Sequence, residues 1–254
     1  MHVDGYEIDI LIQGFPGKSL FHAGLGWSTV ILIRCPGRVI LIDTGHLGMR
    51  LLLKERLAQK GVTPAAVTDL LLTHAHHDHI VNWPLFGHAQ IFIGASELEW
   101  ALTVPWGETL VPELYARELH HWPTLHLLAD GDEAIPGITA HPAPGHTPGH
   151  LIYVLNGKNH DVIFTGDAVK NRVELVSGRT DMTYDVGVST ASIAMVQKRW
   201  HRRPGSILVP GHDLPMMIGE DGGIKSLGKR EASIKAFYGD DIETPTVFDI
   251  TRAG

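Results

Sequence analysis

Residues 73–79 constrain this chain more than any other segment, because most of their side chains are common metal ligands. The segment reads Thr-His-Ala-His-His-Asp-His and follows a strongly apolar run that is typical of a buried strand. Side-chain direction repeats every two residues along a strand, so His74 and His76 are expected on one side. If the chain then turns, Asp78 and His79 can face the same point. One short segment could therefore supply ligands for two metal ions, which indicates an enzyme.

Three later segments each end in another ligand-type side chain: His146, Asp167 and His212. A glycine precedes each of the three and lets the backbone turn tightly. The end of a strand suits a metal site because a rigid sheet holds ligand geometry accurately. A lone histidine after Pro-Gly is more often a turn residue, but four such pieces in this order are hard to explain as coincidence. His150 could support the loop that carries His146.

The composition excludes several classes of protein. The formal net charge is −7 with no basic arm, so we expect no nucleic-acid partner. The N-terminus lacks a leader pattern and no apolar stretch is long enough to span a bilayer, so we expect a cytoplasmic protein without a membrane partner. The single cysteine, Cys35, excludes an intrachain disulfide. No linker or repeat divides the chain, so one domain over residues 1–254 is expected.

Hydrophobic patterns predict mixed α/β structure. Apolar and β-branched runs predict a meander of antiparallel strands over residues 6–13, 30–33 and 39–43. Apolar spacing predicts a helix over residues 46–60, and another helix is expected just after His79.

Beyond the cluster, residues 96–99 match a capping box that would open a helix. Residues 103–124 are expected to be irregular or helical, and a sheet pattern resumes at residue 125. Residues 190–200 favour a helix, and residues 226–238 are predicted to form the last helix of the chain.

At this point the sequence resembles the metallo-β-lactamase superfamily. The matching pieces are Asp43 in a Leu-Ile-Asp-Thr-Gly segment, the His-x-His-x-Asp-His cluster, His146, Asp167 and His212. They run through residues 41–212, and the flanking strand patterns extend the resemblance over nearly the whole chain. The resemblance implies an α/β fold, a four-layer αββα sandwich with the site at one edge between the two sheets.

Carried over residue by residue, the resemblance assigns one metal ion to His74, His76 and His146. Imidazole and carboxylate ligands suit zinc, although iron and manganese accept the same ligand types. Two Zn²⁺ ions are therefore the expected cofactors.

The resemblance assigns a second metal ion to Asp78, His79 and His212, with Asp167 bridging both ions. Asp43 would stand outside the ligand set, accept a hydrogen bond from a ligand imidazole and fix its tautomer.

The implied chemistry follows from the charges. Two divalent cations roughly 3.5–4 Å apart can share a bridging water and lower its pKa to about neutrality. The resulting hydroxide attacks an acyl carbon or a phosphorus centre, and Asp78 could relay a proton to the leaving group. No serine or cysteine nucleophile is needed.

Asp167 and Lys170 indicate which subgroup of the superfamily this chain most resembles. The bridging position of the β-lactamases themselves is not aspartate, so Asp167 favours the group that includes glyoxalase II, lactonases and RNA-processing nucleases. The overall layout is most similar to the quorum-quenching lactonases. Those enzymes commonly carry a tyrosine three residues after the bridging aspartate, whereas this chain has Lys170. Lys170 could contact a substrate oxygen or be a solvated surface lysine.

Three hypotheses for the reaction remain open. The leading one is a dinuclear hydrolase of a small-molecule ester, lactone or thioester, in a chain that could form a homodimer. The second is a phosphodiesterase or phosphotriesterase that uses the same site. The third is a mono-iron oxidoreductase resembling persulfide dioxygenase, against which the intact Asp78, His79 and His212 argue.

Overall fold

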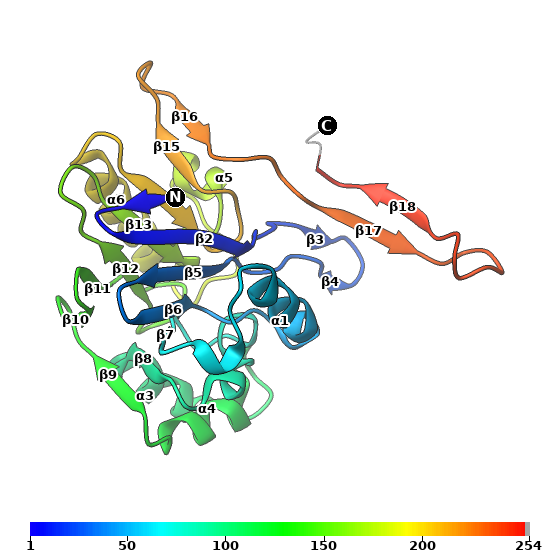
Figure 1. The fold of residues 1–254 in the computed structure, drawn as a ribbon, viewed down its shortest axis with the longest axis horizontal. Helices are drawn as coiled ribbons and strands as arrows, with labels where there is room; N and C mark the ends of the chain where they lie inside the picture. The colour runs from blue at the N-terminus through cyan, green and yellow to red at the C-terminus, as the bar shows by residue number, and fades with distance from the viewer. Residues whose placement is uncertain (252–254) are drawn as a thin grey trace.

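A computed structural model describes residues 1–251 as two seven-stranded sheets packed face to face, with helices on both outer faces (Figure 1). In spatial order, the strands of the first sheet are β1 (His2–Val3), β2 (Tyr6–Ile12), β5 (Val30–Cys35), β6 (Arg38–Ile42), β7 (Asp69–Leu71), β8 (Gln90–Gly94) and β9 (Leu125–Leu128). Strands β1, β2, β5 and β6 pair antiparallel in that order, which confirms the predicted meander. Strands β6, β7, β8 and β9 pair in parallel.

The second sheet is antiparallel except for one central pair. Its strands, in spatial order, are β10 (Glu133–Ile135), β11 (Ile138–Pro142), β12 (Leu151–Leu155), β13 (Val162–Gly166), β14 (Ile207–Pro210), β15 (Met216–Ile218) and β16 (Ile224–Ser226). Strands β13 and β14 run in parallel. Two small hairpins lie outside both sheets: β3 (Lys18–Ser19) with β4 (Ala23–Gly24), and β17 (Ser233–Ala236) with β18 (Thr246–Asp249).

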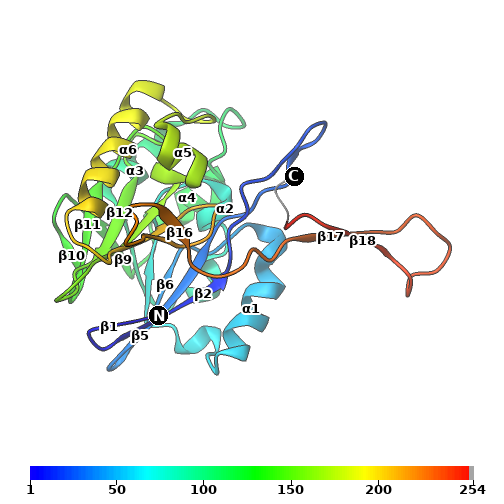
Figure 2. The same cartoon turned by 90° about the horizontal axis from the view of Figure 1, so that it is seen from above.

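The helices form the outer layers (Figure 2). Their bounds are α1 (Arg50–Gln59), α2 (His77–Ile80), α3 (Ala95–Thr103), α4 (Glu113–His120), α5 (Arg172–Ser177) and α6 (Val186–His201). Helices α1, α3 and α4 pack on the first sheet, and α5 and α6 pack on the second. Within residues 1–251, no helix is both long enough and apolar enough to cross a membrane.

Alternation along the central strands builds three apolar layers. On β5, Ile31 and Ile33 face the second sheet, while Leu32 faces the helices. On β12, Tyr153 faces the first sheet, and Val154 packs with α6. Strands buried on both faces read as continuous apolar runs, which explains the sequence of these segments. The predicted αββα sandwich is therefore confirmed.

Three local predictions need correction. Residues 226–238 are not helical: Gly228 adopts a φ of 103°, and Ile234 and Ala236 alternate with exposed residues in β17. The predicted helix over residues 46–60 begins with a 3₁₀ turn, and α1 starts at Arg50. The capping box is also wrong, because α3 already begins before Ser96 and no side chain caps it.

Parallel pairing brings the critical strand ends to one edge of the sandwich. Ile42 at the end of β6 pairs with Leu71 near the end of β7. Gly166 at the end of β13 pairs with Pro210 at the end of β14. The segments that leave these four strands therefore meet at the carboxyl edge, where open α/β sheets generally bind ligands. This edge also receives the start of β12, which runs antiparallel to β13.

The outer layer over the second sheet offers a test of the packing. Trp200 of α6 is buried against that sheet and its indole N–H donates to the carbonyl of Ser206 (2.8 Å). We predict that Trp200→Ala lowers the free energy of unfolding by about 3–5 kcal/mol, because it leaves a large cavity. Trp106→Ala, at an exposed tryptophan, should cost far less. Urea unfolding of both variants measures this, and equal losses would contradict the assignment of Trp200 to the core.

Candidate metal centre

Seven side chains that the sequence singled out converge at the carboxyl edge. They come from the segment after β7, the loops before and after the β12–β13 pair, and the end of β14: His74, His76, Asp78, His79, His146, Asp167 and His212. Each of them belongs to at least one set of three side chains whose nitrogen and oxygen ligand atoms lie within 4.8 Å of one another. The structure therefore assembles residues that are up to 138 positions apart in the chain into one site.

One group consists of His74, His76 and His146, all buried. His76 Nδ1 lies 3.0 Å from His146 Nε2, so two ring nitrogens face each other. The ring of His74 stands edge-on to both others at centroid distances of 4.8 Å. Burial lowers the pKa of His76 to about 4 and lowers the pKa of His74 and His146 well below the usual value. All three imidazoles are therefore neutral at pH 7, the form that binds a cation.

The second group consists of Asp78, His79 and His212. Asp78 Oδ2 lies 3.5 Å from His79 Nε2 and 3.4 Å from His212 Nε2. Burial alone would lower the pKa of His79, but the nearby carboxylates of Asp78, Asp167 and Asp43 outweigh it and raise that pKa. This group therefore carries a strongly negative potential.

Asp167 lies between the two groups. Its Oδ2 is 3.2 Å from His146 Nε2 in the first group. Its Oδ1 is 3.3 Å from His79 Nε2 and 3.2 Å from His212 Nε2 in the second. Burial would raise the pKa of Asp167, but His212, His79 and His146 hold it well below the ordinary value. One ionised carboxylate thus faces both groups, each oxygen toward a different one.

Asp43 contacts the ligand-bearing segment at three points. Its Oδ1 accepts the Thr73 N–H (2.9 Å), and its Oδ2 accepts the Thr73 hydroxyl (2.8 Å) and the His79 Nδ1–H (2.8 Å). A carboxylate cannot donate, so Nδ1 of His79 carries a proton, and Nε2 of the same ring faces the site. Asp43 achieves this with a left-handed backbone, at φ 57°, which costs energy that the surrounding sheet must supply.

Several atoms of the site have no hydrogen-bond partner among the described residues. These buried atoms are Nε2 of His74 and His79, Nδ1 of His146 and Oδ1 of Asp167. Leaving a buried polar atom unpaired costs about 1–3 kcal/mol, so such atoms seldom cluster without a reason. Five imidazoles and two carboxylates converge here, a donor set that fits divalent cations. The residues present therefore fit a metal centre.

Comparison with known proteins agrees with this geometry. The family model of the Metallo-beta-lactamase superfamily matches residues 23–212. The chain belongs to the metallo-beta-lactamase superfamily. It is 36% identical over 97 residues to metallo-beta-lactamase domain-containing protein 1 of Xenopus laevis, a match that covers 36% of this chain and 40% of that relative. The alignment thus spans only two-fifths of the relative's length.

Solved structures share the fold. A protein of Staphylococcus aureus named a probable metal-dependent hydrolase superposes with a TM-score of 0.75 at 18% identity, covering 91% of this chain and 99% of that one. A dizinc quorum-quenching lactonase with a bound product superposes with a TM-score of 0.63 at 18% identity, covering 91% and 93%. At 18% identity, the two structures show that the fold is shared and nothing more.

Glu97 is a functional candidate that sequence reasoning missed in this metallo-beta-lactamase domain. Its side chain is buried and turns toward the ligand loops. Its Oε1 accepts the Ala75 N–H (2.8 Å), and its Oε2 accepts the Thr147 hydroxyl (2.7 Å) and the Gly149 N–H (3.0 Å). Burial raises the pKa of Glu97 to about 7, against the effect of these three hydrogen bonds. Glu97 therefore ties the loop of His74 and His76 to the loop of His146.

His150 supports the site from behind. Its Nε2 accepts the backbone N–H of Asp167 (3.0 Å), and its ring stacks on His74 at a centroid distance of 4.8 Å. The sequence suggested that His150 holds the loop of His146; its side chain instead positions Asp167 and His74.

Lys170 is held by its own loop. Its Nζ lies 2.8 Å from Glu174 Oε1, 3.1 Å from Thr180 Oγ1 and 2.9 Å from the Asp181 carbonyl. An ammonium has three N–H donors, so these partners use all of them. The side chain is only 12% exposed, and the reading as a solvated surface lysine is wrong. The Lys170 carbonyl also accepts the His212 N–H (2.7 Å), which couples this loop to the site.

The contacts of Glu97 predict that it positions the ligand loops. In Glu97→Gln, an amide N–H₂ replaces one accepting oxygen, so at least one buried donor loses its acceptor. We expect the free energy of unfolding to fall by about 1–3 kcal/mol and the affinity for zinc to fall about 10–100-fold. Thermal unfolding and zinc titration measure the two effects.

Glu99→Gln on the exposed face of the same helix is the matched control for Glu97→Gln. Indistinguishable zinc affinity and stability in the two variants would show that Glu97 does not position the loops.

Proposed function

We propose that this chain is a dinuclear metal-dependent hydrolase. One cation would be held by His74, His76 and His146, and the other by Asp78, His79 and His212. The position of Asp167 carries the proposal, because its two oxygens face the two groups at 3.2–3.3 Å. A mononuclear iron oxidoreductase would have no use for the second group, which here is complete. We propose Zn²⁺ in both positions, with iron and manganese as the alternatives.

Bound cations would supply a water activated for attack and a positive charge beside the substrate oxygen. Side chains around that centre hold its ligands in fixed positions. Asp43, His150 and Glu97 fix the ligand segments from the protein side. We propose that Asp78 also relays a proton to the leaving group, because its Oδ2 lies beside His79 and His212 in the second group.

We propose an ester, lactone or thioester of a small molecule as the substrate, rather than a nucleic acid or a membrane lipid. The net charge of −7 disfavours polyanions. The single cysteine, Cys35, packs beside the core between the sheets and is no nucleophile for acyl transfer at this edge. The fold is shared with a dizinc lactonase, although Lys170, engaged by its own loop, stands where a lactonase tyrosine would be expected.

A substrate panel tests this proposal. Zinc-loaded protein is assayed with lactones, thioesters, aryl esters, phosphodiesters and phosphotriesters at matched concentrations. We predict turnover of carboxylic substrates with a kcat/KM at least about tenfold above that for phosphorus esters. The opposite order would replace the acyl substrate with a phosphoryl one, while turnover of neither class would refute hydrolysis.

The donor set predicts the metal requirement. We expect about two zinc ions per chain by elemental analysis, loss of activity on chelation and recovery when zinc is added back. The melting temperature should also rise on zinc binding, because a ligand that binds only the folded state stabilises it. One iron per chain, or recovery with iron or manganese but not zinc, would overturn the zinc assignment.

Asp167 should be indispensable. Asp167→Asn keeps the shape of the side chain but removes the charge that faces both groups. Loss of an outer partner of a metal site typically costs 10–100-fold in activity or metal affinity, so we expect a loss of more than about 100-fold here. Asp130→Asn, at an exposed carboxylate, is the control. Wild-type turnover by folded Asp167→Asn protein would contradict the dinuclear mechanism.

A further inference from the structure

A C-terminal hairpin projects from the sandwich (Figures 1 and 2). We call residues 233–249, which comprise β17, the connecting loop and β18, the arm. Its strands pair only with each other, in the register Ile234 to Phe248. The arm joins the body near Gln13, whose side chain contacts Lys229 and Glu231. A lone two-stranded hairpin is marginally stable in water, so this arm needs a surface to pack on.

The arm exposes an unusual amount of apolar surface. Tyr238 and Ile242 near its tip are 77% and 76% exposed, and Phe237, Val247 and Phe248 are also exposed. Scattered exposed apolar residues are ordinary, but five large ones within twelve residues form a patch. Such a patch marks an interaction surface.

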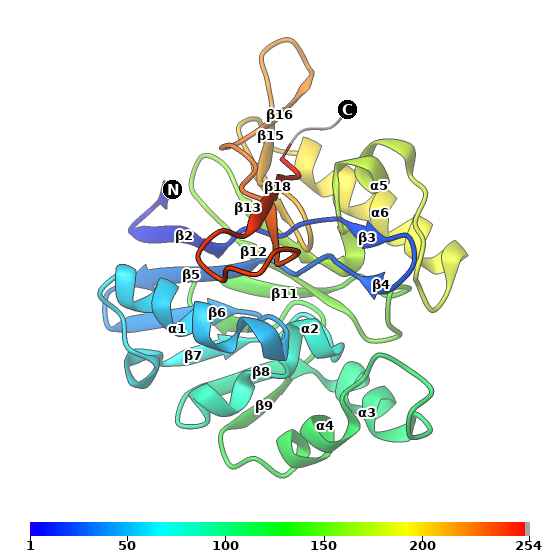
Figure 3. The same ribbon diagram turned by 90° about the vertical axis from the view of Figure 1, so that its right-hand side faces the viewer.

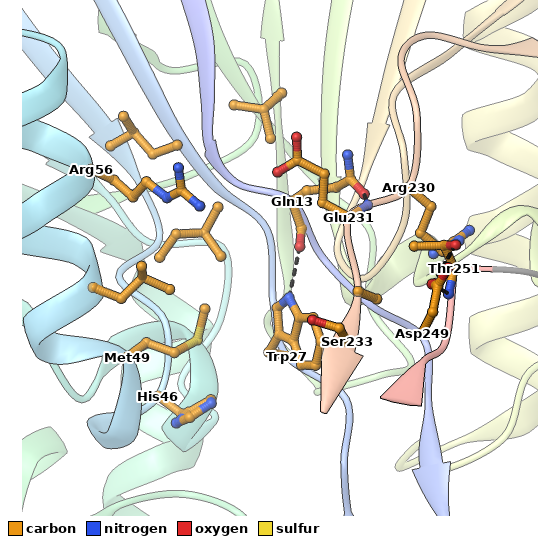
Figure 4. Close-up of a pocket in the computed structure, with 15 residues that line it drawn as sticks. Gln13, Trp27, His46, Met49, Arg56, Arg230, Glu231, Ser233, Asp249 and Thr251 are labelled. Carbon is orange, nitrogen blue, oxygen red and sulfur yellow. Dashed lines mark hydrogen bonds between the residues drawn. The ribbon is translucent and has the colours of Figure 1, made fainter. Parts of the chain in front are cut away.

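A groove of about 900 Å³ lies between helix α1 and the base of the arm. In Figure 4, Met49 and Arg56 form one wall, Arg230 and Asp249 form the other, and Trp27 lies between them. Ile10, Ile12 and Leu52 add apolar lining. The neighbouring Leu51 on α1 is exposed. The groove and this part of α1 therefore offer apolar side chains together with charged ones.

The charges of the arm and of α1 are opposite. The tip of the arm carries Asp240, Asp241 and Glu243 and no basic side chain. Helix α1 carries three basic side chains, Arg50, Lys54 and Arg56, against one carboxylate, Glu55. Within residues 1–251, none of the three carboxylates at the tip forms an ion pair, and neither does Lys54 or Arg56.

The arm does not use its own groove. In Figure 1 its tip points away from α1, and in Figure 3 the arm extends toward the viewer. Each copy of the chain therefore carries the groove and the basic helix that complement the arm, but the arm does not reach them within its own copy. A twofold axis would satisfy both copies, because each would give an arm and receive one.

We propose that two copies of this chain form a homodimer by reciprocal insertion of each arm into the groove of the other copy. Phe237, Tyr238 and Ile242 enter beside Met49 and Leu52 of the partner copy. Asp240 and Glu243 pair with the basic side chains of that copy's α1. The dimer does not depend on the reaction proposed above, and its test needs no substrate.

Charge reversal tests the exchange in full-length, zinc-loaded protein. One variant combines Asp240→Lys with Glu243→Lys on the arm; the other combines Lys54→Glu with Arg56→Glu on α1, of which Arg56 lines the groove. Like charges across an interface cost several kcal/mol, so each variant alone should dimerise more than about tenfold more weakly than wild type. Sedimentation velocity over a concentration series measures this. Glu99→Lys with Glu118→Lys, on exposed positions of α3 and α4, is the control.

Mixing the two variants decides the case. In a mixed dimer the reversed arm meets the reversed groove, while the native arm meets the native groove, so both contacts regain opposite charges. We expect the equimolar mixture, and a chain carrying all four changes, to dimerise as wild type. A monomeric wild type, or a dimer that the arm changes leave intact, would overturn the proposal. Circular dichroism and zinc content confirm that each variant is folded.

Discussion

The geometry of the site depends on the buried carboxylate of Asp43. It fastens the end of β6 to the end of β7 through Thr73, and to α2 through His79. The neighbouring Thr44 repeats the link, because its N–H and hydroxyl both donate to the His79 carbonyl. These bonds hold α2 against a sheet whose both faces are buried, so the imidazoles cannot turn independently. The left-handed backbone of Asp43 is strained, and the surrounding strands hold it in that conformation.

The two proposed cation positions are not equivalent. The first is built from neutral imidazoles that burial keeps deprotonated, whereas the second includes Asp78 and lies beside Asp43. Asp167 moderates this asymmetry, since it presents an oxygen to each side. The second position therefore attracts positive charge more strongly, and the first offers the more rigid geometry. The support from Glu97 and His150 acts mainly on the first position, where no carboxylate other than Asp167 contributes.

Much of this site could be predicted from the sequence because its signals are short-range. The two-residue spacing of His74 and His76, and the apolar runs before Asp167 and His212, are visible without tertiary structure. Glu97 was missed because its partners lie in loops distant along the chain. Lys170 stayed open because its contacts with Glu174 and Asp181 depend on how its own loop folds, which no sequence pattern indicates. The C-terminal helix failed because residues 226–238 have no core face to bury, and cross-strand pairing replaced it.

The ligands come from both sheets, and their order along the chain has a consequence for synthesis. Domains fold as the chain emerges from its N-terminus. The first group is complete once residue 146 has emerged, but the second waits for His212, which arrives only after α6 has crossed over and placed β14 beside β13. Under the proposed assignment, a growing chain can assemble the ligands of its first cation while the second sheet is still incomplete, and β14 then brings the last ligand of the second position. Metal uptake would then be ordered in time, and the second cation would report that the fold is finished.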